Sequence, residues 1–221
     1  MKKEIIICLP SKGRLNPSVL NIFKKKKLKI VFTKGERDLI GYVHNKKFKL
    51  KILFVHAREC IDALANSTAD IAISGKDLLF NSNPNVQKKI KIYKDLDFGH
   101  ASLKIFKSIY WIDCASLLDV SEIAKNKPLK LITKYRTLVE NFLSAKNVRN
   151  VEVLDSEGAT EIALRINQAS LVADISSSGK TAAANDLSEL NDGLILKSSA
   201  VCMVAKKSLK KKGIKNVLSL F

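Results

Sequence analysis

The segment with the clearest chemical character is the run Asp-Ile-Ser-Ser-Ser-Gly-Lys-Thr at residues 174–181. It follows an apolar stretch and precedes an alanine-rich one, which is typical of a loop between a strand and a helix. Small hydroxylated residues and a glycine let backbone N–H groups point at one oxyanion, and the start of a helix adds partial positive charge. We predict that this loop binds a phosphate through Ser177, Ser178, Gly179, Lys180 and Thr181.

The loop differs from a Walker A motif, because the first glycine of that motif would fall on Asp174. A carboxylate at this position does not bind phosphate, but it accepts hydrogen bonds from hydroxyl groups. An aspartate directly before a phosphate loop therefore fits a ribose 5-phosphate, with the acid on the ribose hydroxyls. The alternative is a serine-rich helix cap that binds no ligand.

Arginine is scarce in this chain, and three of its arginines follow or flank predicted strands in the first hundred residues. The guanidinium group forms paired hydrogen bonds with phosphate oxygens. Several such turns together favour a polyanion site, whereas any one of them alone is equally consistent with a solvated turn. The candidate residues of these turns are Lys12, Gly13, Arg14, Arg37, Arg58, Gly75, Lys76 and Asp77.

The elements that must position these residues alternate between strand-like and helix-like patterns, which predicts an α/β fold. Strands are expected at 4–9, 29–33, 48–55, 70–74, 89–96, 103–112, 129–133, 151–154, 170–175 and 194–205, and the main helices at 16–27, 59–65, 137–145 and 159–167. We predict two lobes with mostly parallel sheets, the first formed by residues 1–97 plus 182–221 and the second by 98–181. The active site is expected in the cleft between the lobes.

The charge balance is 39 Lys+Arg against 21 Asp+Glu, a formal net charge of +18. Such a balance raises nucleic-acid binding as a hypothesis. The positive charge is mostly lysine spread over the polar segments, and no lysine cluster is interleaved with aromatic residues as a base-stacking surface would be. An RNA-binding protein is therefore a minor alternative, and we expect no nucleic-acid partner.

The four cysteines, Cys8, Cys60, Cys114 and Cys202, form no CxxC pair, and the three histidines are dispersed. The spacing of a metal cage is absent, so the metal ligands are unknown at this stage. Each cysteine lies in or beside an apolar stretch, which predicts buried thiols in a reducing compartment. No apolar run approaches the roughly 18 residues of a membrane helix, so we expect a cytoplasmic protein with no membrane partner.

Taken together, the motifs resemble those of ATP phosphoribosyltransferase in its short form, nearly from end to end. The matching segments are 9–15, 55–59, 69–77, 95–99, 133–135, 158–161, 174–181 and 199–200. The chain departs from the family pattern at Asn167, Ser170 and Arg136, where the family often has Gly, Asp and Pro. The resemblance implies a fold like the type II periplasmic binding proteins. It also implies transfer of the 5-phosphoribosyl group from phosphoribosyl pyrophosphate to N1 of ATP, the first step of histidine biosynthesis.

The resemblance further implies roles for individual residues. Arg58 and Arg37, with Mg²⁺, are expected to stabilise the departing pyrophosphate, and Asp174 the ribose hydroxyls. Tyr135 and Glu161 are also expected to bind substrate, together with the candidate residues of the turns and the phosphate loop given above. Positioning is expected to dominate catalysis, because the neutral N1 nucleophile requires no general base in the attacking step.

The resemblance also implies partners. We expect a homo-oligomer, a dimer, that assembles with a regulatory subunit similar to a histidyl-tRNA synthetase, because too few residues follow Ala205 for a histidine-sensing domain. The main alternative is a non-enzymatic solute- or anion-binding module of the same fold. Such receptors seldom need a Ser-Gly-Lys-Thr phosphate loop together with three arginine turns.

Overall fold

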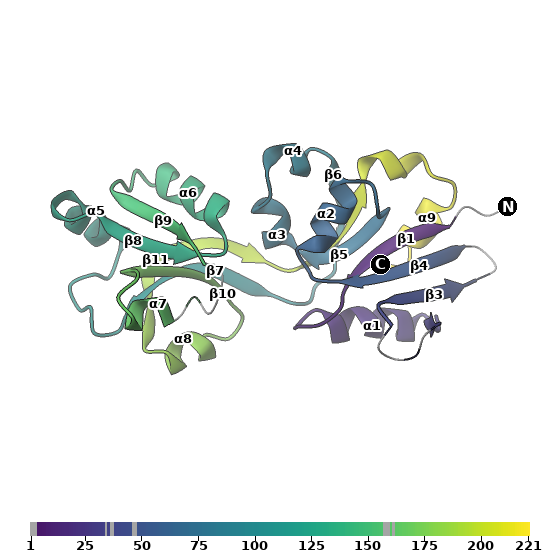
Figure 1. Ribbon diagram of the computed structural model, residues 1–221, viewed down its shortest axis with the longest axis horizontal. Helices are drawn as coiled ribbons and strands as arrows, with labels where there is room; N and C mark the ends of the chain where they lie inside the picture. The colour runs from purple at the N-terminus through teal and green to yellow at the C-terminus, as the bar shows by residue number, and fades with distance from the viewer. Residues whose placement is uncertain (1–3, 34, 36–37, 46–47, 157–159, 161) are drawn as a thin grey trace. The chain divides into compact units, whose positions relative to one another are not determined.

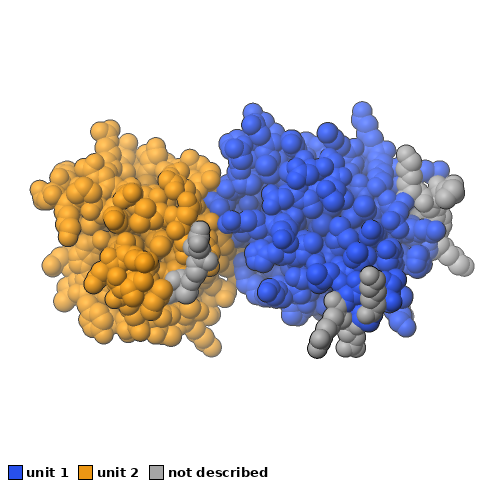
Figure 2. Space-filling view, viewed as in Figure 1, with its two compact units in different colours: residues 1–99, 199–221 blue, residues 100–198 orange. Residues whose placement is uncertain are grey.

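The chain folds as two compact units, each with its own sheet (Figures 1 and 2). A computed structural model describes residues 4–33, 35, 38–45, 48–156, 160 and 162–221. Unit 1 comprises residues 1–99 and 199–221, and unit 2 comprises 100–198. The first predicted boundary lies within two residues of the observed one. The predicted return to the first lobe at 182 is wrong, because strand β11 (Leu187–Ser198) pairs with β7 (Ala101–Ser108) inside unit 2.

Unit 1 is built on a seven-stranded sheet of order β2-β3-β4-β1-β5-β12-β6. Its strands are β1 (Ile5–Pro10), β2 (Val31–Phe32), β3 (Ile40–His44), β4 (Lys49–Val55), β5 (Ile71–Gly75), β6 (Ile90–Asp95) and β12 (Ala200–Ala205). The central strands β4, β1 and β5 are parallel. The outer pairs are antiparallel, because β3 and β4 are consecutive strands paired side by side and β12 returns from unit 2. The sheet is therefore mixed rather than mostly parallel.

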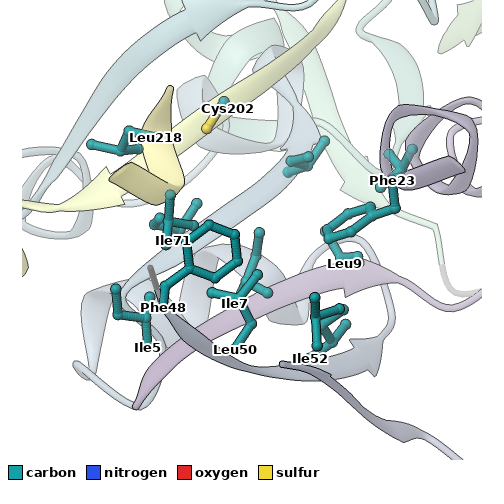
Figure 3. Packing of buried hydrophobic residues seen from close by; sticks show 14 of the residues in the cluster. Ile5, Ile7, Leu9, Phe23, Phe48, Leu50, Ile52, Ile71, Cys202 and Leu218 are labelled. Carbon is teal, nitrogen blue, oxygen red and sulfur yellow. The ribbon is translucent and has the colours of Figure 1, made fainter. Parts of the chain in front are cut away.

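Strand β1 is buried on both faces of this sheet. Ile5, Ile7 and Leu9 belong to one apolar cluster, which Figure 3 shows together with residues of β4 and helix α1 (Asn16–Lys25). Cys8 lies in a second cluster, with residues of helix α2 (Glu59–Ala65). Alternate residues of a strand point to opposite faces, so helices must cover the sheet on both sides. The remaining helices of unit 1 are α3 (Lys76–Phe80), α4 (Pro84–Gln87), the 3₁₀ helix Lys206–Lys210 and α9 (Ile214–Leu218).

Unit 2 is built on a five-stranded sheet of order β11-β7-β10-β8-β9. Besides β7 and β11, it contains β8 (Leu129–Thr133), β9 (Val151–Asp155) and β10 (Leu171–Ser176), and its helices are α5 (Leu117–Asn126), α6 (Arg136–Ala145), α7 (Ile162–Arg165) and α8 (Lys180–Ala184). Strands β10, β8 and β9 are parallel, whereas β7 and β11 run antiparallel at the other edge. The predicted helix at 159–167 is shorter in the structure, and residues 159 and 161 lie outside the described part of the chain.

The carboxylate of Asp70, the residue directly before β5, is buried in unit 1. Asp70 accepts hydrogen bonds from the Ile6 N–H at 2.9 Å, the Ser208 hydroxyl at 2.7 Å and the Lys211 ammonium at 2.6 Å. These contacts join the first strand to the end of the chain. Hydrogen bonds to a charged acceptor are stronger than neutral ones, so Asp70 contributes to the stability of unit 1.

The four cysteines are buried and unpaired, as predicted. Burial disfavours the charged thiolate and raises the pKa of Cys8 and Cys114 to about 11 and that of Cys202 to about 12. The pKa of Cys60 is raised still further by burial and by its neighbours Cys8 and Glu59. These thiols are therefore packing residues. In the part of the chain that the structure describes, no helix has the length and apolar character needed to cross a membrane.

Candidate functional site

In both units the candidate residues follow the carboxyl ends of strands. The turn after β1 carries Lys12, Gly13 and Arg14, and the turns after β4 and β5 carry Arg58 and Lys76. In unit 2, Tyr135 follows β8, and the phosphate loop begins within the last residues of β10. Ligands of open α/β sheets gather at such ends, because the strands terminate there and the following loops are free to vary.

The phosphate loop closes around a small pocket of unit 2 with a volume of about 110 Å³. Its polar wall is formed by Asp174, Ser176, Ser177, Ser178, Lys180 and Thr181, and its apolar floor includes Phe106, Val172 and Leu187. Ser177, Ser178, Lys180 and Thr181 are exposed and face solvent or a ligand. The pocket therefore combines hydroxyl donors and one ammonium group on a rigid apolar base, which suits a compact anion.

The shape of the loop depends on Gly179 and Ser176. Gly179 has a φ of 73°, a left-handed conformation that glycine adopts without strain. Its N–H donates to the Ser176 hydroxyl at 2.9 Å. This N–H group is thus used within the loop and does not point at the ligand, contrary to the simplest form of the prediction. Ser176 is a residue that the sequence analysis missed, although a serine three residues before a glycine is a recognisable turn signal.

Helix α8, which follows the loop, has five residues. A helix this short aligns few peptide dipoles, so its N-terminus adds less positive charge than the sequence analysis assumed. The side-chain hydroxyls, Lys180 and the loop N–H groups must supply most of the attraction for an anion. The Asn185 amide donates to the Thr181 carbonyl at 2.8 Å and ties the end of α8 to its first turn.

Asp174 lies in β10, two residues before the strand ends, and its carboxylate lines the same pocket. One carboxylate oxygen accepts the Ile175 N–H at 2.7 Å. The side chain is half-buried, so it is held in place while it still reaches the pocket. This geometry brings the predicted ribose-binding acid and the predicted phosphate-binding residues together, as the sequence analysis expected.

Tyr135 is the residue directly before α6, and it is 7% exposed. Its N–H donates to the hydroxyl of Thr133 at 3.0 Å. The burial leaves little of the ring available to a substrate. Tyr135 therefore has a structural role in the turn after β8, in addition to the predicted contact with substrate.

The turn after β1 presents Lys12 and Arg14 at the surface of unit 1. Gly13 has a φ of 85°, and a Cβ there would meet no atom within 4 Å. The glycine is thus required by the backbone conformation and not by lack of space. The Arg14 guanidinium donates to the carbonyl of Gly99, which fixes the direction of this cation.

Arg58 directly precedes α2, and its side chain is exposed. A hydrogen bond from β5 holds the turn that carries Arg58, because the buried Ser74 hydroxyl donates to the Ala57 carbonyl at 2.7 Å. The His56 N–H donates to the Glu59 carboxylate at 2.7 Å and closes the same turn. Ser74 was not among the predicted residues, and its partner lies 17 positions away in the sequence.

The turn after β5 holds Gly75, Lys76 and Asp77. A Cβ on Gly75 would collide with the Asp77 carboxylate, so a larger residue here would have to displace that side chain. The Lys76 N–H donates to the Ser199 carbonyl at 3.0 Å. Asp77 is 2% exposed, which favours a structural role over the predicted contact with substrate. Lys76 remains the partly exposed cation of this turn.

Two predicted residues, Arg37 and Glu161, lie outside the described residues, so the structure does not place them. Within the described ranges, no group of three or more histidine, cysteine, aspartate or glutamate side chains could hold a metal ion. The described part of the protein thus offers single carboxylates, such as Asp174, and no preformed cage.

Two α/β units joined by two chain crossings, with the candidate phosphate loop at the end of a parallel strand, define a two-lobed α/β protein. A sequence profile described as "HisG: ATP phosphoribosyltransferase" matches residues 56–221. The chain therefore belongs to the ATP phosphoribosyltransferase family, the transferases that carry out the first step of histidine biosynthesis.

Curated relatives carry the same name. An ATP phosphoribosyltransferase of Brucella suis is 31% identical over 212 residues, which cover 93% of this chain and 91% of the relative. One of Rhodopseudomonas palustris is 32% identical over 206 residues, which cover 90% of this chain. The chain spans 63% of the length of that second relative.

Solved structures show the same fold. The "ATP phosphoribosyl transferase (HisG:HisZ) complex" of Thermotoga maritima contains a chain with a TM-score of 0.75 and 18% identity, covering 98% of this chain and 94% of that one. An arginine-bound ArgBP of T. maritima, a Gly52Ala mutant, has a TM-score of 0.57 and 13% identity, covering 98% of this chain and 92% of that one. The predicted likeness to periplasmic binding proteins is confirmed at the level of the fold.

Proposed function

We propose that this chain transfers the phosphoribosyl group to ATP by holding phosphoribosyl pyrophosphate on the phosphate loop and Asp174. The observation that carries the proposal is the pocket of unit 2, in which a half-buried carboxylate and exposed hydroxyls line one small cavity. Ser177, Ser178, Lys180 and Thr181 hold the 5-phosphate, and Asp174 accepts hydrogen bonds from the ribose hydroxyls. These contacts hold the phosphoribosyl group at its 5-phosphate and at its ribose hydroxyls.

The chemistry that remains is alignment and stabilisation of the leaving group. In the step, adenine N1 forms a bond to the anomeric carbon while the bond from that carbon to the pyrophosphate oxygen breaks with its electron pair. Negative charge grows on the pyrophosphate as the bond lengthens, so cations near it lower the barrier. We assign this role to Arg58, with Arg37, and assign Lys12, Arg14 and Lys76 to binding of the anionic substrates.

A cation that accompanies the pyrophosphate fits this arrangement. Mg²⁺ is usually held by one or two carboxylates together with substrate phosphates, and not by an all-protein cage. The half-buried side chain of Asp174, which is among the residues that line the pocket, suits this mode. When bound, Mg²⁺ would neutralise part of the pyrophosphate charge. Glu161, which lies outside the described residues, remains a proposed substrate-binding residue.

Regulation is expected to come from a second protein. The related fold in T. maritima occurs in a HisG:HisZ complex. We propose that this chain likewise forms a homodimer that binds a regulatory subunit similar to a histidyl-tRNA synthetase, in the cytoplasm. Allostery requires a second site with different affinity in two states, which the partner would supply. Histidine at millimolar concentration should then inhibit the isolated chain weakly, and addition of the partner should restore inhibition.

The decisive experiment incubates the pure protein with ATP, phosphoribosyl pyrophosphate and Mg²⁺ and follows phosphoribosyl-ATP and pyrophosphate. Stoichiometric formation of both products, absent when either substrate is omitted, supports the proposal. An Asp174→Asn variant that remains folded should turn over much more slowly than wild type, at a rate that can still be measured. A folded wild-type protein that forms neither product would refute the proposed function, and a fully active Asp174→Asn variant would refute the role of that acid.

A further inference from the structure

We infer that Thr133 is a positioning residue that sets the backbone beside the ribose-phosphate pocket, an inference that rests on the proposed function. Thr133 is the last residue of β8, and it is fully buried. Its hydroxyl donates to the Ala173 carbonyl at 2.7 Å and accepts the Tyr135 N–H at 3.0 Å. One hydroxyl therefore bonds both the residue directly before Asp174 and the residue directly before α6.

The main chain of Thr133 adds a third link. Its carbonyl accepts the Ser156 N–H at 2.9 Å, just after the end of β9. The Thr160 hydroxyl in turn donates to the Ser156 hydroxyl at 3.3 Å, and Thr160 is fully buried. Thr133 thus links the segments that follow β8 and β9 to Ala173 within β10, and these are the three parallel strands of unit 2.

The position of the Thr133 hydroxyl in the sheet explains how it acts on the backbone beside Asp174. The parallel register between β10 and β8 ends at the pair Ala173 and Thr133. On its other side, β10 continues to pair with β7 as far as Ser176. Beyond Ala173, Asp174 is therefore held by the sheet on the β7 side, while on the β8 side the Thr133 hydroxyl bonds the carbonyl that precedes it. Loss of this bond removes the link on the β8 side of the peptide that carries Asp174, while the pairing with β7 remains.

Valine has nearly the shape of threonine but can neither donate nor accept a hydrogen bond. In Thr133→Val the Ala173 carbonyl loses the Thr133 hydroxyl as a donor, and the Tyr135 N–H loses it as an acceptor. Serine keeps the hydroxyl and loses one methyl group. The pair Thr133→Val and Thr133→Ser therefore separates the hydrogen bonds from the packing. A matched control is Ser121→Ala, because Ser121 donates to the Leu117 carbonyl within helix α5.

The test is a double-mutant cycle between Thr133 and Asp174, measured as kcat/KM for phosphoribosyl pyrophosphate, with thermal unfolding to show that each variant is folded. If Thr133 acts through Asp174, Thr133→Val lowers kcat/KM by about tenfold in the wild-type background and by less than about twofold in Asp174→Asn. Thr133→Ser and Ser121→Ala should stay within about twofold of wild type. An equal loss in both backgrounds, or a loss in Thr133→Ser as large as that in Thr133→Val, overturns the inference.

Amide hydrogen exchange gives a readout that does not depend on turnover. In Thr133→Val the amide of Tyr135 should exchange faster than in wild type and in Thr133→Ser, because its buried acceptor is gone. Unchanged exchange overturns the inference even when the enzyme is active. If wild-type protein forms no phosphoribosyl-ATP, the proposed function fails, while the exchange experiment still decides whether Thr133 holds these segments.

Discussion

The double change Ser178→Ala with Thr181→Ala probes the phosphate loop directly. Both hydroxyls line the pocket of unit 2, and neither residue belongs to the core of the fold. A hydrogen bond to a charged acceptor contributes about 1.5–3 kcal/mol, so two such bonds to a phosphate correspond to about 3–6 kcal/mol. Both residues are exposed, and water can partly replace them, which favours the lower end of this range. We therefore expect the affinity for phosphoribosyl pyrophosphate to fall about 100-fold.

Isothermal titration calorimetry with phosphoribosyl pyrophosphate and Mg²⁺ measures this loss, and thermal unfolding shows whether the variant is folded. Ser121→Ala combined with Ser144→Ala is a matched control, because it removes two hydroxyls from helices α5 and α6 of the same unit. The control should bind like wild type. If the folded loop variant binds within about threefold of wild type, the assignment of the 5-phosphate to this loop is wrong.

Three further predictions concern the arginine turn, the cysteines and the buried carboxylate. Arg58→Ala should lower kcat about 30- to 1000-fold with a smaller change in KM, because pyrophosphate charge develops mainly in the transition state. Steady-state kinetics measure both constants. A rise in KM with unchanged kcat would instead place Arg58 in ground-state binding. Iodoacetamide at pH 8 should label none of the four cysteines in the native protein within the time that labels them fully in denaturant, because burial holds the pKa of Cys8 and Cys114 at about 11; rapid native labelling, seen by mass spectrometry, would contradict this. Asp70→Ala should lower the free energy of unfolding by about 3–5 kcal/mol in urea titrations, because it leaves the Ile6 N–H, the Ser208 hydroxyl and Lys211 without their acceptor; a loss below about 1 kcal/mol would show that water replaces the carboxylate.

Much of the local structure could be predicted from the sequence where the pattern is strong and bounded. The strand Leu129–Thr133 and the helix Glu59–Ala65 were predicted to the residue, because apolar periodicity and polar flanks mark their ends. The strand Ile40–His44 was missed; it is the first strand of a hairpin with β4 and also pairs with β2. Its identity depends on pairing with a strand that comes later in the chain.

Strand β11 shows why the boundary between the units was misplaced. The predicted strand began only at residue 194, but residues 191–193 belong to the same strand, with a shift in register between Glu189 and Leu194. The Asp192 carboxylate accepts the Leu117 N–H at 2.8 Å, so a polar residue within the strand supports the start of α5. Only the tertiary partner, 75 positions away, reveals this role.

In the candidate site, too, the features that depend on local sequence differ from those that depend on distant contacts. The loop at residues 174–181 could be chosen as a candidate from the sequence, because its residue types and spacing suggest the chemistry within eight positions, and its role stays a prediction. Ser74 and Thr133 could not, because each acts through a carbonyl that is distant in the sequence, at Ala57 and at Ala173. A hydroxyl that supports a binding residue looks, in the sequence, like any other serine or threonine.

The late position of β12 in the chain has a consequence for biosynthesis. Unit 2 is a continuous segment, whereas unit 1 begins first and is completed only by residues 199–221. Until β12 leaves the ribosome, β5 and β6 lack the strand that lies between them, and the buried face around Ile71 and Ile73 has an open edge. Exposed apolar edges of this kind pair readily with other chains. A message truncated before codon 199 would therefore yield a second unit with all its strands attached to a first unit that lacks β12 and is prone to aggregate.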